Sequence, residues 1–272
     1  MKKSTISLIT SCLLLVAFSS CSVNKAKEDN SLKKYFDENK VDGCFTMMNN
    51  TSGKITVYNM KYDTMRFSPA STFTIMNSLI GLQTGRIIND SMIIKWDAVK
   101  RAPDSLNRDM NMIDAFELNA EPYFQEVARR IGKDTIKQWI DSLGYGNKNI
   151  EGPIDSFWLN NHLTISPDEQ LGLVKRLYFD QLPFRKSVQQ MVRNVMLQED
   201  NTAYKLSYKT GLGNDENGHG IGWVVGWIEE DHQVYFFVTF VKAPDANADI
   251  NVARMNITKG ILQQLGYMKG VK

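Results

Sequence analysis

A serine stands near the start of an apolar segment in the stretch SPASTFTIMNSLIGLQTG, which runs from Ser68 to Gly85. The apolar residues after Ser71 nearly surround a helix, so the helix should be buried and Ser71 should open onto the interior. A helix N-terminus offers a positive dipole end and free N–H groups, which stabilise an oxyanion that forms there. Ser71 is therefore a candidate nucleophile for acyl transfer, although a serine at a helix start is most often only an N-cap.

A second candidate group, Lys209-Thr210-Gly211, ends a predicted strand. A hairpin that contains Trp223 and Trp227 follows it. The edge of such a strand can bind a substrate amide by backbone pairing, while the lysine and the threonine hold a carboxylate. The tripeptide alone is weak evidence, because a lysine that leaves a strand into a glycine turn is common.

Composition excludes several other classes of function. The chain has 32 basic and 30 acidic residues, and removal of Lys2 and Lys3 with a leader would balance them at 30 each, so no nucleic-acid footprint is expected. The three histidines have no metal-ligand spacing, and we expect neither a metal nor an organic cofactor. Cys44 would be the one cysteine left in the folded domain, so no disulfide is expected within it.

The N-terminus indicates export. A basic start at Lys2 and Lys3 precedes the apolar run Ile6–Phe18 and then Ser19-Ser20-Cys21, the pattern of a secretory signal. Cysteine directly after small residues resembles a bacterial lipobox, which predicts lipidation at Cys21 and a membrane-anchored protein of the cell envelope, on the periplasmic side. The alternative is an ordinary secreted protein in which Cys21 has no role.

The predicted organisation is a signal peptide (1–20), a polar tether (21–40) and one domain (41–272) with a helical part at about 70–200. Segments rich in β-forming residues predict strands at both ends of this domain, at 44–48, 55–58, 204–210, 221–228 and 234–241. Helices are predicted at 71–84, on either side of Gly132, after the capping box of Ser166 and Glu169, and at 250–265. The fold class is therefore α+β, with an antiparallel sheet and a helical insertion.

The serine segment and Lys209-Thr210-Gly211 together resemble the S-x-x-K and K-T-G signatures of serine penicillin-recognising enzymes. The segments PASTF, SLIGL, ARRIG, LGYGNKNI, IDSFWL, ISPDEQ and IGW follow one another as in class D (oxacillinase-type) β-lactamases. The resemblance runs from about Gly43 to Leu265. It implies the β-lactamase/transpeptidase-like fold.

The resemblance also implies roles for individual residues. Ser71 would attack the β-lactam carbonyl, and the N–H groups of Ser71 and Leu212 would form the oxyanion hole. Lys209 would line the pocket, while Thr210 and Arg254 would hold the substrate carboxylate.

Two further motifs match the family. Tyr145-Gly146-Asn147 corresponds to its Y-G-N motif. Trp158 corresponds to the tryptophan that orients the family's catalytic base, which is a carboxylated lysine one turn after the serine.

The sequence departs from the family at that base, because Thr74 occupies the lysine position. A threonine cannot form a carbamate and cannot act as a base near neutral pH. The family's S-x-V motif is also changed, since Asn119 stands for the shuttle serine and Glu121 for the valine. Either Glu121 replaces the carbamate as the base, or the site has decayed and Glu121 has no catalytic role.

Three functions remain open from the sequence. The first is a β-lactamase that is acylated at Ser71 and hydrolyses penicillin-type amides with impaired turnover. The second is a penicillin-binding pseudoenzyme or sensor-like lipoprotein that does not turn over. The third is a cell-envelope interaction protein with a vestigial cleft. The expected partner is a β-lactam or a peptidoglycan-like small molecule.

Overall fold

The structure is a computed structural model that describes residues 26–245 and 248–269. The predicted signal peptide and Cys21 lie outside these residues. Within the described ranges, no helix combines the length and the apolar character needed to cross a bilayer.

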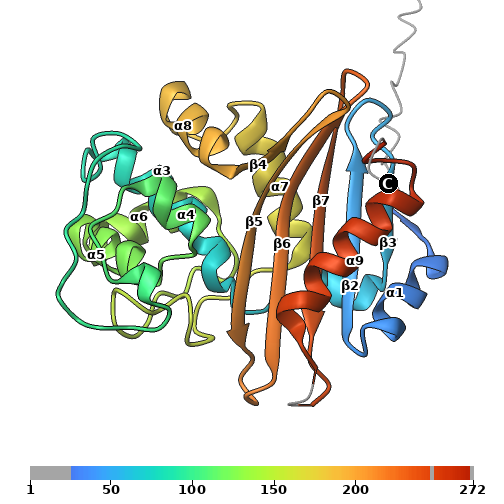
Figure 1. The fold of residues 1–272 in the computed structure, drawn as a ribbon, viewed down its shortest axis with the longest axis horizontal. Coiled ribbons are helices and arrows are strands. Elements are labelled where there is room, and N and C mark those ends of the chain that lie inside the picture. Colours follow the sequence, from blue (N-terminus) through green and yellow to red (C-terminus); the bar gives the residue numbers. More distant parts are fainter. Residues whose placement is uncertain (1–25, 246–247, 270–272) are drawn as a thin grey trace, which may run out of the picture.

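A seven-stranded sheet forms the centre of the described molecule, in the order β1-β3-β2-β7-β6-β5-β4 (Figure 1). Neighbouring strands are antiparallel, except that β1 pairs with β3 in parallel. The strands are β1 (Lys27–Glu28), β2 (Asp42–Asn49), β3 (Ile55–Tyr58), β4 (Leu197–Asp200), β5 (Tyr204–Asn214), β6 (Gly220–Glu230) and β7 (Gln233–Lys242). The sheet thus takes strands from both ends of the domain, which confirms the predicted α+β class.

Helices cover both faces of the sheet and one of its edges. In Figure 1, α1 and α9 lie on one face and α7 on the other, while α3 to α6 and α8 stand beside the edge formed by β5 and β4. The α-helices are α1 (Lys33–Glu38), α2 (Met60–Thr64), α3 (Thr74–Gln83), α4 (Met112–Glu117), α5 (Glu121–Ile131), α6 (Lys133–Leu143), α7 (Pro167–Tyr178), α8 (Lys186–Met196) and α9 (Ile250–Gln264). Short 3-10 helices are η1 (Asn30–Leu32), η2 (Ala70–Phe73) and η3 (Asp104–Leu106).

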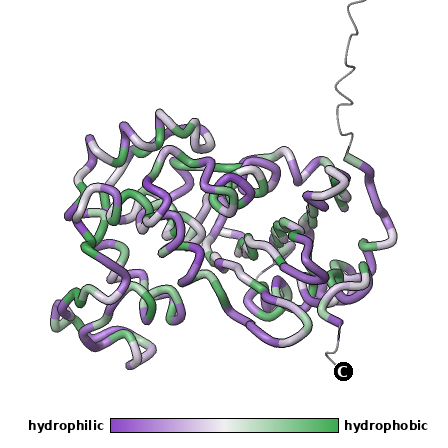
Figure 2. The backbone as a smooth tube through the Cα atoms, turned by 90° about the horizontal axis from the view of Figure 1, so that it is seen from above, coloured by the Kyte–Doolittle hydropathy of each residue, from purple (hydrophilic) through white to green (hydrophobic). Residues whose placement is uncertain are grey.

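The sequence pattern accounts for the helical part. Every residue of α3 from Thr74 to Leu82 is buried, as its nearly continuous apolar pattern predicts. The outer helices instead alternate hydrophobic and hydrophilic residues, which Figure 2 shows along the tube. The capping box of α7 is present, since the Glu169 carboxylate accepts the Ser166 N–H at 2.9 Å. The helical part meets β5 mainly through η2 and α8, whereas α7 packs on β7, β6 and β2.

One boundary predicted from sequence was wrong. Part of the predicted tether belongs to the domain, because Lys27–Glu28 pairs with β3 and Lys33–Glu38 forms a helix against α9. Its polar residues concealed Leu32 and Phe36, which are buried in the core between the sheet and α9. The turn between β6 and β7 lies at Asp231 and His232, both with positive φ, within the gap between the two predicted strands.

Candidate active site

Ser71 lies within a 3-10 turn that is tied to a neighbouring loop. The N–H of Ala70 donates to the Trp158 carbonyl at 3.2 Å, and the Ser68 hydroxyl donates to the same oxygen at 2.8 Å. Pro69 is the N-cap of this 3-10 turn and Phe73 is the N-cap of α3, which begins at Thr74. Ser71 is therefore not the cap of either element. The bonds to the Trp158 carbonyl hold the residues just before Ser71 in place.

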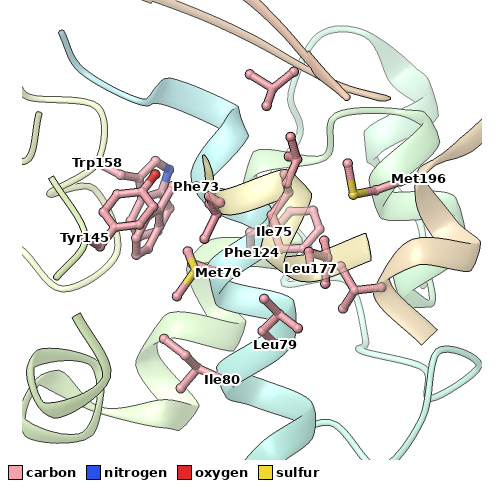
Figure 3. Close-up of a cluster of buried hydrophobic side chains, with 14 of the residues drawn as sticks. Phe73, Ile75, Met76, Leu79, Ile80, Phe124, Tyr145, Trp158, Leu177 and Met196 are labelled. Carbon is pink, nitrogen blue, oxygen red and sulfur yellow. The ribbon is translucent and has the colours of Figure 1, made fainter. Parts of the chain in front are cut away.

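The side chains after Ser71 anchor the turn in the core. The Phe73 ring stacks on Trp158 with centroids 5.5 Å apart and meets Tyr145 edge-on at 5.6 Å. Figure 3 shows this aromatic group beside the apolar side chains of α3. Trp158, predicted to orient a base, thus supports the Ser71 turn through its carbonyl and through its ring.

Strand β5 approaches the same turn very closely. A Cβ added to Gly211 would lie 3.2 Å from the Pro69 carbonyl oxygen and 3.3 Å from the Thr72 nitrogen. A Cβ added to Gly213 would lie 3.2 Å from Ala70 Cβ. A side chain at Gly211 would therefore push the strand away from the serine, which explains why glycine follows Lys209-Thr210.

The edge of β5 beside Ser71 is open. Strand β4 pairs with β5 only up to Ser207, so the segment 208–214 has a strand neighbour on one side only, which is β6. Alternate backbone groups of an unpaired strand edge point outward and can bind an extended ligand. Leu212, predicted to complete the oxyanion hole, lies on this segment and is 38% exposed.

Lys209 is buried beside an amide rather than a carboxylate. Its side chain is 2% exposed, and its Nζ donates to Asn119 Oδ1. The Thr210 hydroxyl donates to the same oxygen at 3.3 Å. Burial, with the nearby Arg254 cation as a smaller cause, lowers the pKa of Lys209 to about 7. A substantial fraction of this lysine is therefore an uncharged amine at neutral pH.

Arg254 connects the last helix to β5. It is 6% exposed, its Nη1 donates to the Gly211 carbonyl, and its Nη2 donates to Asn251 Oδ1 at 2.6 Å. Burial lowers the pKa of Arg254 to about 10, so the guanidinium stays charged at neutral pH. This places a side chain that stays positively charged at the Lys209-Thr210-Gly211 edge.

Thr74 is buried, and its hydroxyl donates to the Ser71 carbonyl at 2.8 Å. This bond points the hydroxyl back along the helix axis, and a hydroxyl has no acid–base function near pH 7 in any case. The residue at the motif position thus supports the turn. The family's carboxylated lysine does not fit this chain, because no amine is present at residue 74.

Glu121 begins α5 and is turned toward other partners. Its carboxylate accepts from Gln125 Nε2 at 2.9 Å. Burial raises its pKa, and the charges that act on it are those of Arg101 and Asp155. Among the residues that the structure describes, it has no hydrogen bond to Ser71. Its role as a base remains a prediction.

The structure thus brings most of the predicted residues to one place. The turn of Ser71 packs on the β5 edge with Lys209, Thr210, Gly211 and Leu212, and Arg254 and Asn119 bond to that edge. Sequence reasoning missed the direct bond between Asn119 and Lys209. The changed S-x-V motif was the available signal, since a serine and an asparagine both offer an oxygen to a neighbouring amine. Within the described ranges no cluster of His, Cys, Asp or Glu could hold a metal.

A serine in the turn before a buried helix, beside an open K-T-G strand edge, is the arrangement expected of a serine penicillin-recognising protein. The family model of the penicillin-binding protein transpeptidase domain matches residues 43–263. The chain therefore belongs to this family, and its relatives place it with the class D β-lactamases.

Three relatives illustrate the similarity. A probable β-lactamase, YbxI of Bacillus subtilis, is 38% identical over 90% of this chain and 87% of its own length. The structure of FUS-1 (OXA-85), a class D β-lactamase from Fusobacterium nucleatum, has 32% identity and a TM-score of 0.84, covering 89% of this chain and all of that one. The C-terminal domain of the Bacillus licheniformis BlaR penicillin-receptor has 28% identity and a TM-score of 0.83, covering 89% and 96%.

Arg254→Ala is expected to weaken β-lactam binding, or slow acylation, by about tenfold or more. The reason is that a charge-assisted contact to the substrate carboxylate contributes roughly 1.5–3 kcal/mol. Competition with a fluorescent penicillin measures the affinity. Lys259→Ala is the matched control, since Lys259 lies on the same helix but pairs with Glu199. Equal affinity of the wild type and Arg254→Ala would show that Arg254 does not bind the substrate carboxylate.

Proposed function

We propose that penicillin-type β-lactams acylate this protein at Ser71 and that the acyl-enzyme is hydrolysed slowly. The Ser71 oxygen attacks the β-lactam carbonyl carbon, and the ring amide bond opens to leave an ester on the serine. The N–H groups of Ser71 and Leu212 stabilise the negative charge that develops on the carbonyl oxygen.

The side chains at the strand edge support the same proposal. Arg254 supplies positive charge, and Lys209 and Thr210 supply hydrogen-bond donors, beside an open edge that can pair with the substrate amide. β-Lactams of the penicillin type combine an amide with a carboxylate. The site offers complementary groups for both.

Thr74 is the single observation that argues for slow turnover. Its hydroxyl is engaged with the Ser71 carbonyl, and residue 74 supplies no base for the attacking water. Loss of a general base typically slows a reaction about 10² to 10⁴-fold. Acylation suffers less if another group takes the serine proton. A long-lived acyl-enzyme is therefore the expected state in the presence of a β-lactam.

The same observation favours a second function, in which the protein binds and reports β-lactams without useful turnover. The similarity to a penicillin-receptor domain is consistent with it. The two functions differ only in the lifetime of the adduct. A peptidoglycan-like peptide is a third possible occupant of the same open strand edge.

Intact-protein mass spectrometry after incubation with a penicillin tests the proposal. We expect an adduct of one penicillin mass that persists over many minutes, and Ser71→Ala should form none. An adduct on Ser71→Ala would show that the nucleophile is another residue. Absence of both adduct and product in the wild type would contradict the proposal and favour a cell-envelope interaction protein with a vestigial cleft.

Restoring the family pattern tests the account of Thr74. The triple variant Thr74→Lys, Asn119→Ser and Glu121→Val should gain penicillin hydrolysis that increases with added bicarbonate, because a carbamate can form again. Turnover of the wild type should not respond to bicarbonate. Wild-type hydrolysis that already equals that of the triple variant would contradict slow turnover, and Glu121→Gln would then identify whether Glu121 is the base.

We also propose that the protein is exported and anchored by lipid at Cys21. The basic start, the short apolar run and the small residues before Cys21 support this. Cys21→Ala should move the protein from the membrane fraction to the soluble fraction, as measured by immunoblotting. Unchanged partitioning of this variant would contradict lipid anchoring.

A further inference from the structure

The site retains one amine that can be uncharged at neutral pH. Lys209, Gly211 and Gly213 alternate along β5, so the Lys209 side chain points to the sheet face on which a Cβ at either glycine would lie. A Cβ built on either glycine would lie against the residues that flank Ser71, namely Pro69 and Thr72 for Gly211 and Ala70 for Gly213. The Lys209 side chain therefore leaves the strand on the face that packs against the Ser71 turn, and its nitrogen is held there by Asn119.

The surroundings of Lys209 favour the neutral amine. The segment from α4 to α5 presents the Phe116 ring, whose centroid lies 5.7 Å from Nζ, and the Asn119 amide. Helix α9 places the Arg254 cation nearby. On β5 itself, the Lys209 Nζ donates to the Thr210 carbonyl at 3.1 Å. Among the described residues, no carboxylate pairs with this amine. A buried ammonium without a carboxylate partner is unfavourable, so the proton is held weakly.

We propose that Lys209 is the general base that takes the proton from Ser71 during acylation, in place of the lysine that is missing at residue 74. This inference rests on the proposed function. It assigns to Lys209 a proton-transfer role in addition to lining the pocket.

The step is balanced in protons and electrons. The neutral amine of Lys209 accepts the hydroxyl proton while Oγ bonds to the β-lactam carbonyl carbon and the C=O electron pair moves to oxygen. When this intermediate collapses, the C–N bond breaks, and the ring nitrogen takes the proton back from the Lys209 ammonium. The lysine returns to its neutral form, and Ser71 carries the ester.

Asn119 has a positioning role in this scheme. Its Oδ1 accepts from both Lys209 and Thr210, and its backbone has a φ of +50°, which asparagine tolerates better than most residues. An amide oxygen holds the amine in place without stabilising its charge as a carboxylate would. The change from serine to asparagine at this position thus keeps an oxygen beside the lysine.

The pH dependence of acylation is the first test. With the β-lactam at saturating concentration, the first-order rate of adduct formation should rise about tenfold per pH unit below pH 7 and level off above it, because the neutral amine is the reactive form. Quenched-flow mass spectrometry of the wild type measures this rate. A rate that falls as pH rises through 7 would show that the ammonium is the required form, and a rate that is constant from pH 5.5 to 9 would exclude Lys209 as the base.

Lys209→Arg is the second test, because a guanidinium can donate hydrogen bonds as the lysine ammonium does but has no neutral form near pH 7 that could accept a proton. The saturated acylation rate should fall about 10²-fold or more, while the affinity for the intact β-lactam changes little. Lys205→Arg, four residues earlier on the same strand and paired with Asp200, is the matched control and should acylate as the wild type does. Circular dichroism and thermal melting verify that each variant is folded.

The outcomes separate this inference from the proposed function. If the wild type forms an adduct and Lys209→Arg forms it at the same rate, Lys209 is not the base, although Ser71 is still the nucleophile. If the wild type forms no adduct under any condition, the proposed function fails first. Loss of acylation in Lys209→Arg with a wild-type profile that levels off near pH 7 supports the inference.

Discussion

The close approach of β5 to the turn that carries Ser71 is the contact on which the site depends. It joins the helical part to the sheet, and the absence of a side chain at residue 211 lets the two backbones lie this close without displacing Pro69 or Thr72. The Trp158 carbonyl fixes the turn from the other side, through Ala70 and Ser68. A serine held in this way has little freedom to leave the strand edge, so a substrate paired to that edge meets the nucleophile at a set position.

Compared with the motifs of class D β-lactamases, this chain differs at the residue expected to act as the base and matches at the residues expected to bind the substrate carboxylate. The Lys209-Thr210-Gly211 edge and Arg254 are in place, but residue 74 is a threonine that only supports the helix. Recognition and acylation of a β-lactam place smaller demands on proton transfer than activation of water does, since acylation can use any nearby amine that is neutral. The proposed site therefore suits acylation by a β-lactam better than hydrolysis of the resulting ester.

The architecture, and the elements that carry the candidate site, could be predicted from the sequence because they depend on local patterns. Runs rich in Val, Ile and aromatic residues predicted the long strands, the continuous apolar run identified α3 as buried, and Ser166 with Glu169 marked the start of α7. Contacts between segments that are distant in the sequence could not be predicted from such local patterns. The bond between Asn119 and Lys209 spans 90 positions, and it depends on the left-handed backbone at Asn119. The direction of the Glu121 carboxylate likewise depends on where α5 begins, and a shift by one residue turns a helical side chain by about 100°.

The central claim is that a β-lactam acylates Ser71 faster than the resulting acyl-enzyme is hydrolysed. The most direct measurement is the time course of a chromogenic cephalosporin mixed in excess with the protein and followed from the first milliseconds. The account predicts a burst of one equivalent of opened β-lactam per protein, followed by a much slower steady rate that added bicarbonate does not change. Linear product formation from the start, without a burst and accelerated by bicarbonate, would contradict it.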